Sequence, residues 1–253
     1  NQESYEDINN FSKEINFKNQ KIKVNKSEKN SPILELKKCT ISYDSKINIL
    51  SNISLKIFKS DFININGASG AGKSSLLNLI SGLVNPKSGY ILINGKYLNY
   101  DNDDEIINWR KKVAYVPQQI HITQSSLNEN IAWNYFDKKI ALNYKKIKLL
   151  RHICFIEEKD LSINFNKGEL IEGGYSISGG QKQRIGIARS LYQSEKKILI
   201  LDESLSGIEE DLQKNIILRI RKYLPELAII LVTHNKKISD LAENHIYLKQ
   251  NND

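Results

Sequence analysis

One stretch, residues 67–74, constrains the fold of this chain more than any other. Its sequence, Gly-Ala-Ser-Gly-Ala-Gly-Lys-Ser, fits the phosphate-binding pattern G-x-x-x-x-G-K-[ST]. Residues 61–66 before it predict a short strand, and residues 75–80 after it predict the first turns of a helix, which is the setting that the motif requires. This context favours a phosphate cradle over the alternative, a glycine-rich turn with a solvated lysine.

The residue types of this stretch suit the chemistry of a nucleoside triphosphate. Glycines let backbone N–H groups approach phosphate oxygens, and a helix N-terminus adds partial positive charge. Lys73 would reach the β- and γ-phosphates, and the Ser74 hydroxyl would ligate Mg²⁺. The candidate nucleotide-binding residues here are Gly67, Ala68, Ser69, Gly70, Ala71, Gly72, Lys73, Ser74 and Ser75.

Composition is that of an ordinary globular α/β protein, with 40% apolar and 26% charged residues among 253. No run of eighteen apolar residues occurs, so no segment is expected to span a membrane, and no signal peptide is found. Cys39 and Cys154 are predicted to be buried, reduced thiols. Because the chain begins with Asn1 and contains no Met, we expect a piece of a longer polypeptide, or a processed or trimmed one.

The net charge of +8 comes mainly from scattered lysines. Such a charge suits an anionic membrane surface, a nucleic acid or nucleotide phosphates. Lys, Asn and Ile are abundant together, which indicates a general compositional bias, so no nucleic-acid partner is predicted from charge.

Hydrophobic periodicity divides the chain into a short leading part and one larger domain. Residues 1–17 carry apolar residues at helical spacing, and residues 18–31 read as a polar linker, so the domain should cover 32–253. Antiparallel strands are expected at 33–43 and 47–58, and further strands at 90–94, 113–116, 198–201, 228–232 and 245–248. Helices are expected at 105–112, 120–156, 179–192, 212–223 and 236–242.

Strands that alternate with helices indicate an α/β fold with a mostly parallel sheet. A ligand then belongs at the carboxyl ends of the strands, where residues 67–74, Asp202 and His234 fall. Asp202 ends an apolar strand and would hold Mg²⁺ through a water, as a Walker B carboxylate does. Glu203 follows it and could polarise an attacking water as a general base. The alternative for both acids is simple solvation.

The most specific signal is Ile177-Ser178-Gly179-Gly180-Gln181, which resembles the L-S-G-G-Q signature of the ATP-binding-cassette (ABC) family except at Ile177. Physically it is a second anion site, with a serine hydroxyl and glycine N–H donors at a helix start. The resemblance implies that Ser178, Gly179, Gly180 and Gln181 cap the γ-phosphate of ATP held by the loop of another subunit. It also implies a P-loop NTPase fold: a RecA-like, mostly parallel sheet, an antiparallel β subdomain and an inserted α-helical subdomain at about 119–190.

Other family landmarks follow in order over residues 33–248. Tyr43 resembles the aromatic residue that stacks on adenine, a core tyrosine being the alternative. Gln118 resembles the glutamine of the Q-loop, which senses Mg²⁺ and the membrane partner. His234 resembles the switch histidine that contacts the γ-phosphate. Residues 206–209 occupy the D-loop, where Glu209 replaces the usual Asp.

Three features resemble the exporter branch of the family. Residues 126–131 are similar to a segment that follows the Q-loop in exporters, and residues 172–174 match the exporter X-loop in part, with Ile171 in place of its glycine. Residues 1–17 resemble the end of a last transmembrane helix. The loop sequence is also similar to that of some bacterial peptide and bacteriocin exporters. The short separation of Gln118 and Ser178 leaves no room for the coiled coil of repair ATPases, and a single signature disfavours tandem translation factors.

The resemblance therefore implies the ATPase domain of an exporter, with ATP and Mg²⁺ as cofactors. Its expected partners are a second cassette domain, most simply a second copy, and a transmembrane domain of the same polypeptide. Its expected place is the cytoplasmic face of a membrane. Two alternatives stay open: a regulatory or nucleic-acid-linked cassette without transport, and a cassette that binds ATP without hydrolysing it. Glu203 and His234 argue against the second.

Overall fold

The computed structural model describes residues 31–43, 47–133, 141–157, 163–164, 169–170, 177–193 and 195–249. The predicted helix at 1–17, nearly all of the predicted linker and the predicted X-loop residues 172–174 lie outside these ranges. Within the ranges, no helix combines the length and the apolar character that a membrane span needs.

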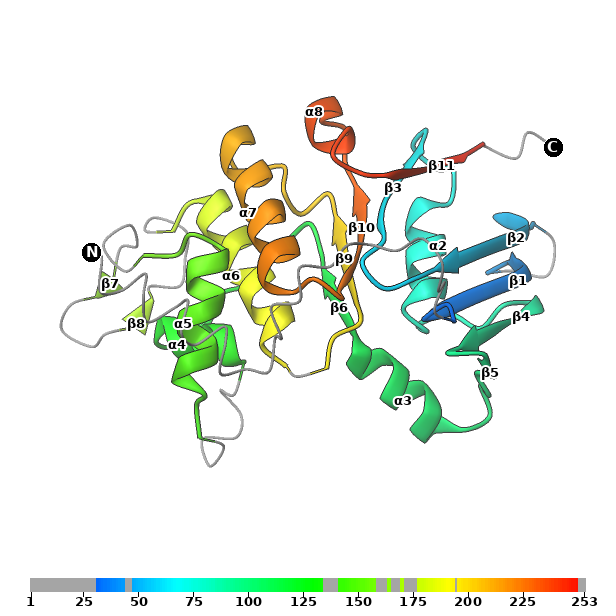
Figure 1. Ribbon diagram of the computed structural model, residues 1–253, viewed down its shortest axis with the longest axis horizontal. Coiled ribbons are helices and arrows are strands. Elements are labelled where there is room, and N and C mark those ends of the chain that lie inside the picture. The colour runs from blue at the N-terminus through cyan, green and yellow to red at the C-terminus, as the bar shows by residue number, and fades with distance from the viewer. Residues whose placement is uncertain are drawn as a thin grey trace. The chain divides into compact units, whose positions relative to one another are not determined.

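The centre of the described domain is a parallel sheet of five strands in the order β11-β3-β10-β9-β6 (Figure 1). The strands are β3 (Phe62–Gly67), β6 (Val113–Val116), β9 (Ile198–Asp202), β10 (Ala228–Val232) and β11 (Asn244–Leu248). All of β10 is buried, as is β9 up to its last residue, which is why both sequences are nearly continuous apolar runs.

A second sheet is antiparallel, in the order β2-β1-β4-β5. Its strands are β1 (Leu34–Ile41), β2 (Leu50–Ile57), β4 (Ser88–Ile93) and β5 (Lys96–Tyr97). The register of β1 shifts on both sides of Cys39, where bulges interrupt its pairing with β2. Two short strands, β7 (Ile163–Asn164) and β8 (Glu169–Leu170), pair with each other antiparallel.

The described helices are α2 (Lys73–Ile80), α3 (Asp103–Lys112), α4 (Leu127–Ala132), α5 (Tyr144–Ile153), α6 (Gly179–Tyr192), α7 (Glu210–Tyr223) and α8 (Lys236–Ser239). Figure 1 shows α2 between the antiparallel sheet and β3, while α4, α5 and α6 gather on the other side of the parallel sheet. One apolar core joins both sheets and α2; it includes Leu36 and Ile57, Leu76 and Leu77, and Ile200 and Ile230. These features confirm the predicted α/β class with its parallel and antiparallel sheets.

The expected helix over 120–156 is wrong in its first part. Residues 120–126 are not helical, and α4 begins only after Ser126, which is its N-cap. The Ser126 hydroxyl accepts from the Glu129 backbone N–H, and the Glu129 carboxylate accepts from the Ser126 N–H. This capping box sets the start of the helix more strongly than the apolar spacing ahead of it. The second part of the expectation corresponds to α5.

Candidate active site

The phosphate-binding loop joins the end of β3 to the start of α2, as its motif predicts. Gly72 is the N-cap of α2 and has a φ of +89°. Any other residue at this position would have to adopt a left-handed backbone conformation, and its Cβ would lie 2.8 Å from Leu50 Cδ2. The sequence therefore uses glycine at the position where the loop turns into the helix.

Lys73 and the two serines after it lie in the first turn of α2. The Lys73 ammonium donates hydrogen bonds to the Gly67 carbonyl at 2.8 Å and to the Ala68 carbonyl at 3.0 Å, which holds it over the loop. Ser74 is exposed, whereas Ser75 is buried. Because the first N–H groups of a helix lack internal partners, Ser75 is better suited to contribute its backbone N–H than its hydroxyl.

Three predicted residues follow three neighbouring strands of the parallel sheet. Strand β9 pairs with β10 through Asp202 and Val232, and with β6 through Leu201 and Val116. Glu203, His234 and Gln118 are therefore expected just beyond the same edge of the sheet, and the structure brings them together there.

The Glu203 carboxylate contacts the other two residues with one oxygen each. Its Oε2 accepts from the Gln118 side-chain amide at 3.4 Å, and its Oε1 lies 3.3 Å from His234 Nε2. The side chain of Glu203 remains 32% exposed and that of His234 77% exposed, so a substrate and water can reach them. This arrangement orients a carboxylate without removing it from solvent, which suits a general base.

The backbone of Glu203 is left-handed, with a φ of +50°. Such a conformation costs of the order of 1–3 kcal/mol for a residue other than glycine. It is held by a hydrogen bond from the Glu203 N–H to the Val232 carbonyl at 3.0 Å. Strain of this kind is concentrated at functional sites, where the surrounding structure enforces it.

Asp202 is oriented by a residue that the sequence analysis did not single out. The Tyr115 hydroxyl donates to Asp202 Oδ2 at 2.7 Å. Burial raises the pKa of Tyr115, and the hydrogen bond to Asp202 raises it further, so Tyr115 stays a donor at neutral pH. Tyr115 lies on β6, which pairs with β9 through Tyr115 and Ile200, and this pairing is visible only in the structure.

The oxygen donors near these strand ends fit Mg²⁺ better than a softer metal. They are the Asp202 carboxylate, the Ser74 hydroxyl and the Gln118 amide oxygen, and hard oxygens of this kind suit Mg²⁺. Among the described residues, His, Cys, Asp and Glu side chains form no group of three that could hold a metal ion. One carboxylate is enough when substrate phosphates and waters supply the other ligands, as is usual for Mg²⁺.

Ser178, Gly179, Gly180 and Gln181 form the N-terminus of α6. Ser178 is the N-cap, and it exchanges two hydrogen bonds with Gln181 in a capping box. Ser178 and Gly179 are exposed, which leaves the helix start accessible to an anion. At Gly180 a Cβ would lie only 2.4 Å from the Gly207 carbonyl oxygen, so glycine is required for this close approach to the D-loop.

The remaining predicted residues lie at the margins. Tyr43 is 58% exposed, and its hydroxyl accepts from the side-chain amide of Asn78 on α2 at 3.5 Å. This contact places the Tyr43 hydroxyl beside α2, the helix that follows the loop. The role of Tyr43 in adenine binding stays a prediction. Glu209 is the N-cap of α7 but makes no side-chain capping hydrogen bond.

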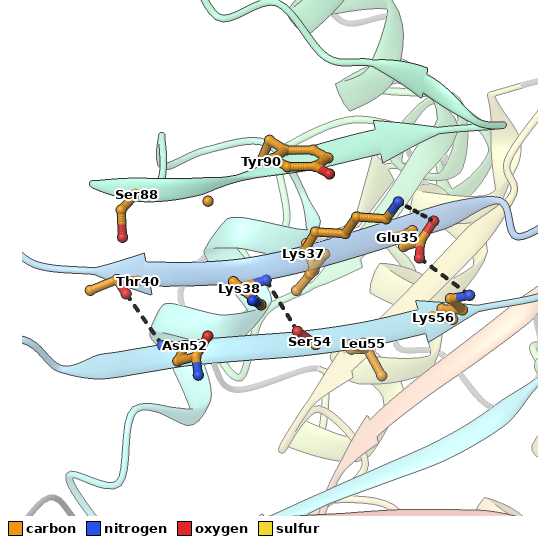
Figure 2. A pocket seen from close by; sticks show the side chains of 12 residues that line it. Glu35, Lys37, Lys38, Thr40, Asn52, Ser54, Leu55, Lys56, Ser88 and Tyr90 are labelled. Carbon is orange, nitrogen blue, oxygen red and sulfur yellow. Dashed lines mark hydrogen bonds and ion pairs between the residues drawn. The ribbon is translucent and has the colours of Figure 1, made fainter.

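A hollow on the outer face of the antiparallel sheet offers no rival site. It is lined by residues of β1, β2 and β4, and Figure 2 shows Glu35 between two of its lysines. The Glu35 carboxylate lies 3.3 Å from Lys56 Nζ and 3.8 Å from Lys37 Nζ. Glu35 pairs with two of the three lysines that line the hollow, and no predicted site residue lines it, so the hollow carries no comparable chemistry.

Comparisons with known proteins show the family to which this chain is similar. Residues 50–206 match the family model described as "ABC transporter". A putative export ATP-binding/permease protein of Rickettsia bellii is 35% identical over 85% of this chain and 36% of its own length. The lactococcin-G-processing and transport ATP-binding protein LagD of Lactococcus lactis is 30% identical over 92% of this chain and 32% of its own length.

Solved structures show the same fold. A dimeric post-hydrolysis state of the ATP-binding cassette MJ0796, bound to ADP and Pi, has a TM-score of 0.69 and 27% identity, over 87% of this chain and 97% of that one. An ATP-bound bacterial Atm1-family ABC exporter has a TM-score of 0.74 and 23% identity, over 88% of this chain and 38% of that one. The chain spans about a third of the length of the exporter relatives that it matches.

Proposed function

The chain belongs to the ABC transporter family, whose cassette domains bind and hydrolyse ATP, and from this premise we propose that it powers export across a membrane as half of a head-to-tail pair. The observation that carries the hydrolytic part is the Glu203 carboxylate, held between Gln118 and His234 beyond the strand ends.

The loop residues bind the triphosphate. The Lys73 ammonium exchanges its two carbonyl partners for β- and γ-phosphate oxygens, and backbone N–H groups of the loop and of the first turn of α2 donate to phosphate oxygens. Ser74, Gln118 and Asp202 would help to hold Mg²⁺, which when bound would neutralise charge that develops on the phosphates. Tyr115 keeps Asp202 in place for this task.

Glu203 takes part in the chemical step. A water oxygen attacks the γ-phosphorus while Glu203 accepts a proton from that water, and the bond to the bridging β–γ oxygen breaks. The products are ADP and inorganic phosphate. His234 Nε2 lies 3.3 Å from Glu203 Oε1, and His234 would steady the Glu203 carboxylate and contact the γ-phosphate. Release of phosphate removes the contacts that held the two surfaces together.

Two copies are needed because one chain separates its two anion sites. The helix that follows the loop, α2, packs on β3, whereas α6, which begins at the signature, packs on β6, with β10 and β9 between them in the sheet. The signature of a second copy would complete the site at Gly67–Ser74. The dimeric state of the MJ0796 cassette supports such a pairing.

Complementation between two inactive variants tests the pairing. Lys73→Ala removes the loop's cation but leaves the signature intact, and Ser178→Arg blocks the signature but leaves the loop intact. Each variant alone should lose turnover, and their mixture should regain it, because one of the two sites in a mixed pair is then complete. Phosphate release measures this, and a mixture as inactive as its components would contradict the proposal.

Export itself is supported by the relatives named as export and bacteriocin transport proteins. This chain spans only about a third of the length of the exporter relatives, which leaves room in them for membrane-spanning segments. We propose that such segments lie in the same polypeptide as this domain, and that this domain lies on the cytoplasmic face. The sequence encoded ahead of Asn1 tests this part, since apolar spans of about 20 residues are expected there. A different kind of domain in that place would contradict it.

A further inference from the structure

Arg189, a partly buried residue of α6, binds the segment of residues 121–133, which follows Gln118. Its Nε donates to the Asn130 carbonyl at 2.8 Å, and its Nη2 to the Asn130 side-chain oxygen at 3.2 Å. Its Nη1 donates to the His121 carbonyl at 2.8 Å. Its guanidinium also lies 4.0 Å from the centre of the Trp133 ring. One side chain therefore contacts the segment near both of its ends.

Asn130, the main partner of Arg189, is itself fixed. It is completely buried, and its side-chain amide donates to the Thr123 carbonyl at 3.1 Å and to the Ser125 hydroxyl at 2.9 Å. Its side-chain oxygen accepts from the Thr123 N–H at 3.0 Å. A fully satisfied, buried network of this kind is rigid. A residue that holds Asn130 therefore holds residues 121–133 as a unit.

A second contact joins the same segment to α6. Ile120 lies against Gly186, where a Cβ would come within 2.5 Å of Ile120 Cδ1. Glycine at this position lets the segment approach the helix closely. The attachment to α6 thus begins only two residues after Gln118, which contacts Glu203.

We propose that Arg189 is a positioning residue, which joins the segment after Gln118 to the signature helix so that the two move as one body. The inference rests on the proposed function, in which the start of α6 completes a partner's site. Arg189 lies about three helical turns from Ser178 on the same helix. A change at the nucleotide, sensed by Gln118 beside Glu203, is thereby passed to the signature.

The planar guanidinium is essential to this role. Arg189 spreads its three hydrogen bonds over two residues while stacking on Trp133, and a lysine ammonium cannot reproduce that geometry. Arg189→Lys therefore keeps the charge and removes the link. Arg221→Lys is a matched control, because Arg221 lies on α7 in an exposed ion pair with Glu243.

A double-mutant cycle of Arg189→Lys with Gln118→Ala, in the whole 253-residue chain, tests the link. Arg189→Lys should lower kcat for ATP hydrolysis about tenfold or more and leave the Kd for ADP within about twofold, because the loop is untouched. Once Gln118→Ala is present, Arg189→Lys should cost less than about threefold, since residues in one network are not additive. Arg221→Lys should change neither quantity.

Two results would overturn the inference. One is additive losses of kcat in the cycle, and the other is an ADP affinity that falls together with kcat, which is what simple damage to the fold produces. Hydrogen exchange of the amides of residues 121–133 gives a readout that needs no turnover. It should speed up in Arg189→Lys while β9 and β10 stay protected, and unchanged exchange would also refute the link. An inactive wild-type chain would instead count against the proposed function.

Discussion

Glu203 illustrates how one residue can be placed by its backbone as much as by its partners. The left-handed conformation at +50° turns the chain directly after β9, and the bond to the Val232 carbonyl holds that turn. The carboxylate then meets Gln118 and His234 with separate oxygens. A group fixed in this way needs little reorganisation to accept a proton from water.

Replacing Glu203 by Gln should separate binding from chemistry. The amide is isosteric but cannot accept the proton, so turnover should fall by about 10²- to 10⁴-fold while nucleotide affinity is kept. Phosphate release and nucleotide titration measure the two quantities. Glu226→Gln, in an exposed pair with Lys59, is the control and should leave both unchanged. Turnover at the wild-type rate in Glu203→Gln would rule out Glu203 as the base.

The sequence predicted Gln118, Glu203 and His234 separately, and the structure brings them together; their roles remain predictions. Tyr115 and Arg189 were not predicted. Their partners, Asp202 and Asn130, lie 87 and 59 residues away in sequence. Neither hydrophobic periodicity nor motif spacing reports contacts of that range, because both describe only neighbours along the chain.

At the scale of helices and strands, burial decided which expectations held. Strands β9 and β10 were predicted because strands buried on both faces leave an unbroken apolar run. The prediction of a helix over residues 120–126 is wrong because the apolar residues there make loop contacts, such as that of Ile120 with Gly186. The residues at 126–131, which resemble an exporter segment, have a local structural role. Ser126 and Glu129 form the capping box of α4, and Asn130 is buried and hydrogen-bonded to Ser125.

The junction of α5 and α7 should make stability depend on pH. Burial, with Arg219 and Lys222 nearby, lowers the pKa of His152, whose Nε2 lies 3.3 Å from the Tyr223 hydroxyl. Below the ordinary histidine pKa of about 6.5 the unfolded chain therefore binds a proton more readily than the folded one. The free energy of unfolding should fall as the pH drops from about 7 toward the lowered pKa.

Urea unfolding at several pH values measures this effect. In His152→Gln the part of the pH dependence that arises from this side chain should vanish. His245→Gln, at an exposed position of β11, should retain the wild-type dependence. An unchanged pH profile in His152→Gln would show that the junction does not titrate as the burial of His152 implies.

At the scale of the whole molecule, the two candidate anion sites of one chain lie on different parts of the domain. The loop belongs to the part of the domain formed by α2 and β3, and the signature belongs to α6 at the β6 edge of the sheet. We therefore propose that the loop at Gly67–Ser74 is half of a composite site, in which ATP would hold two copies together. Hydrolysis, for which Glu203 is the proposed base, would release them.

Association driven by ATP is the most direct test of this account. Light scattering after size exclusion would give the mass of the Glu203→Gln chain with Mg²⁺ and ATP. The account predicts a mass twice the 29.0 kDa of one chain, and a return to one chain when ADP replaces ATP or when Ser178→Arg is added. The account would be contradicted by the mass of one chain for a protein that has ATP bound, or by a dimer that persists when Ser178→Arg is added.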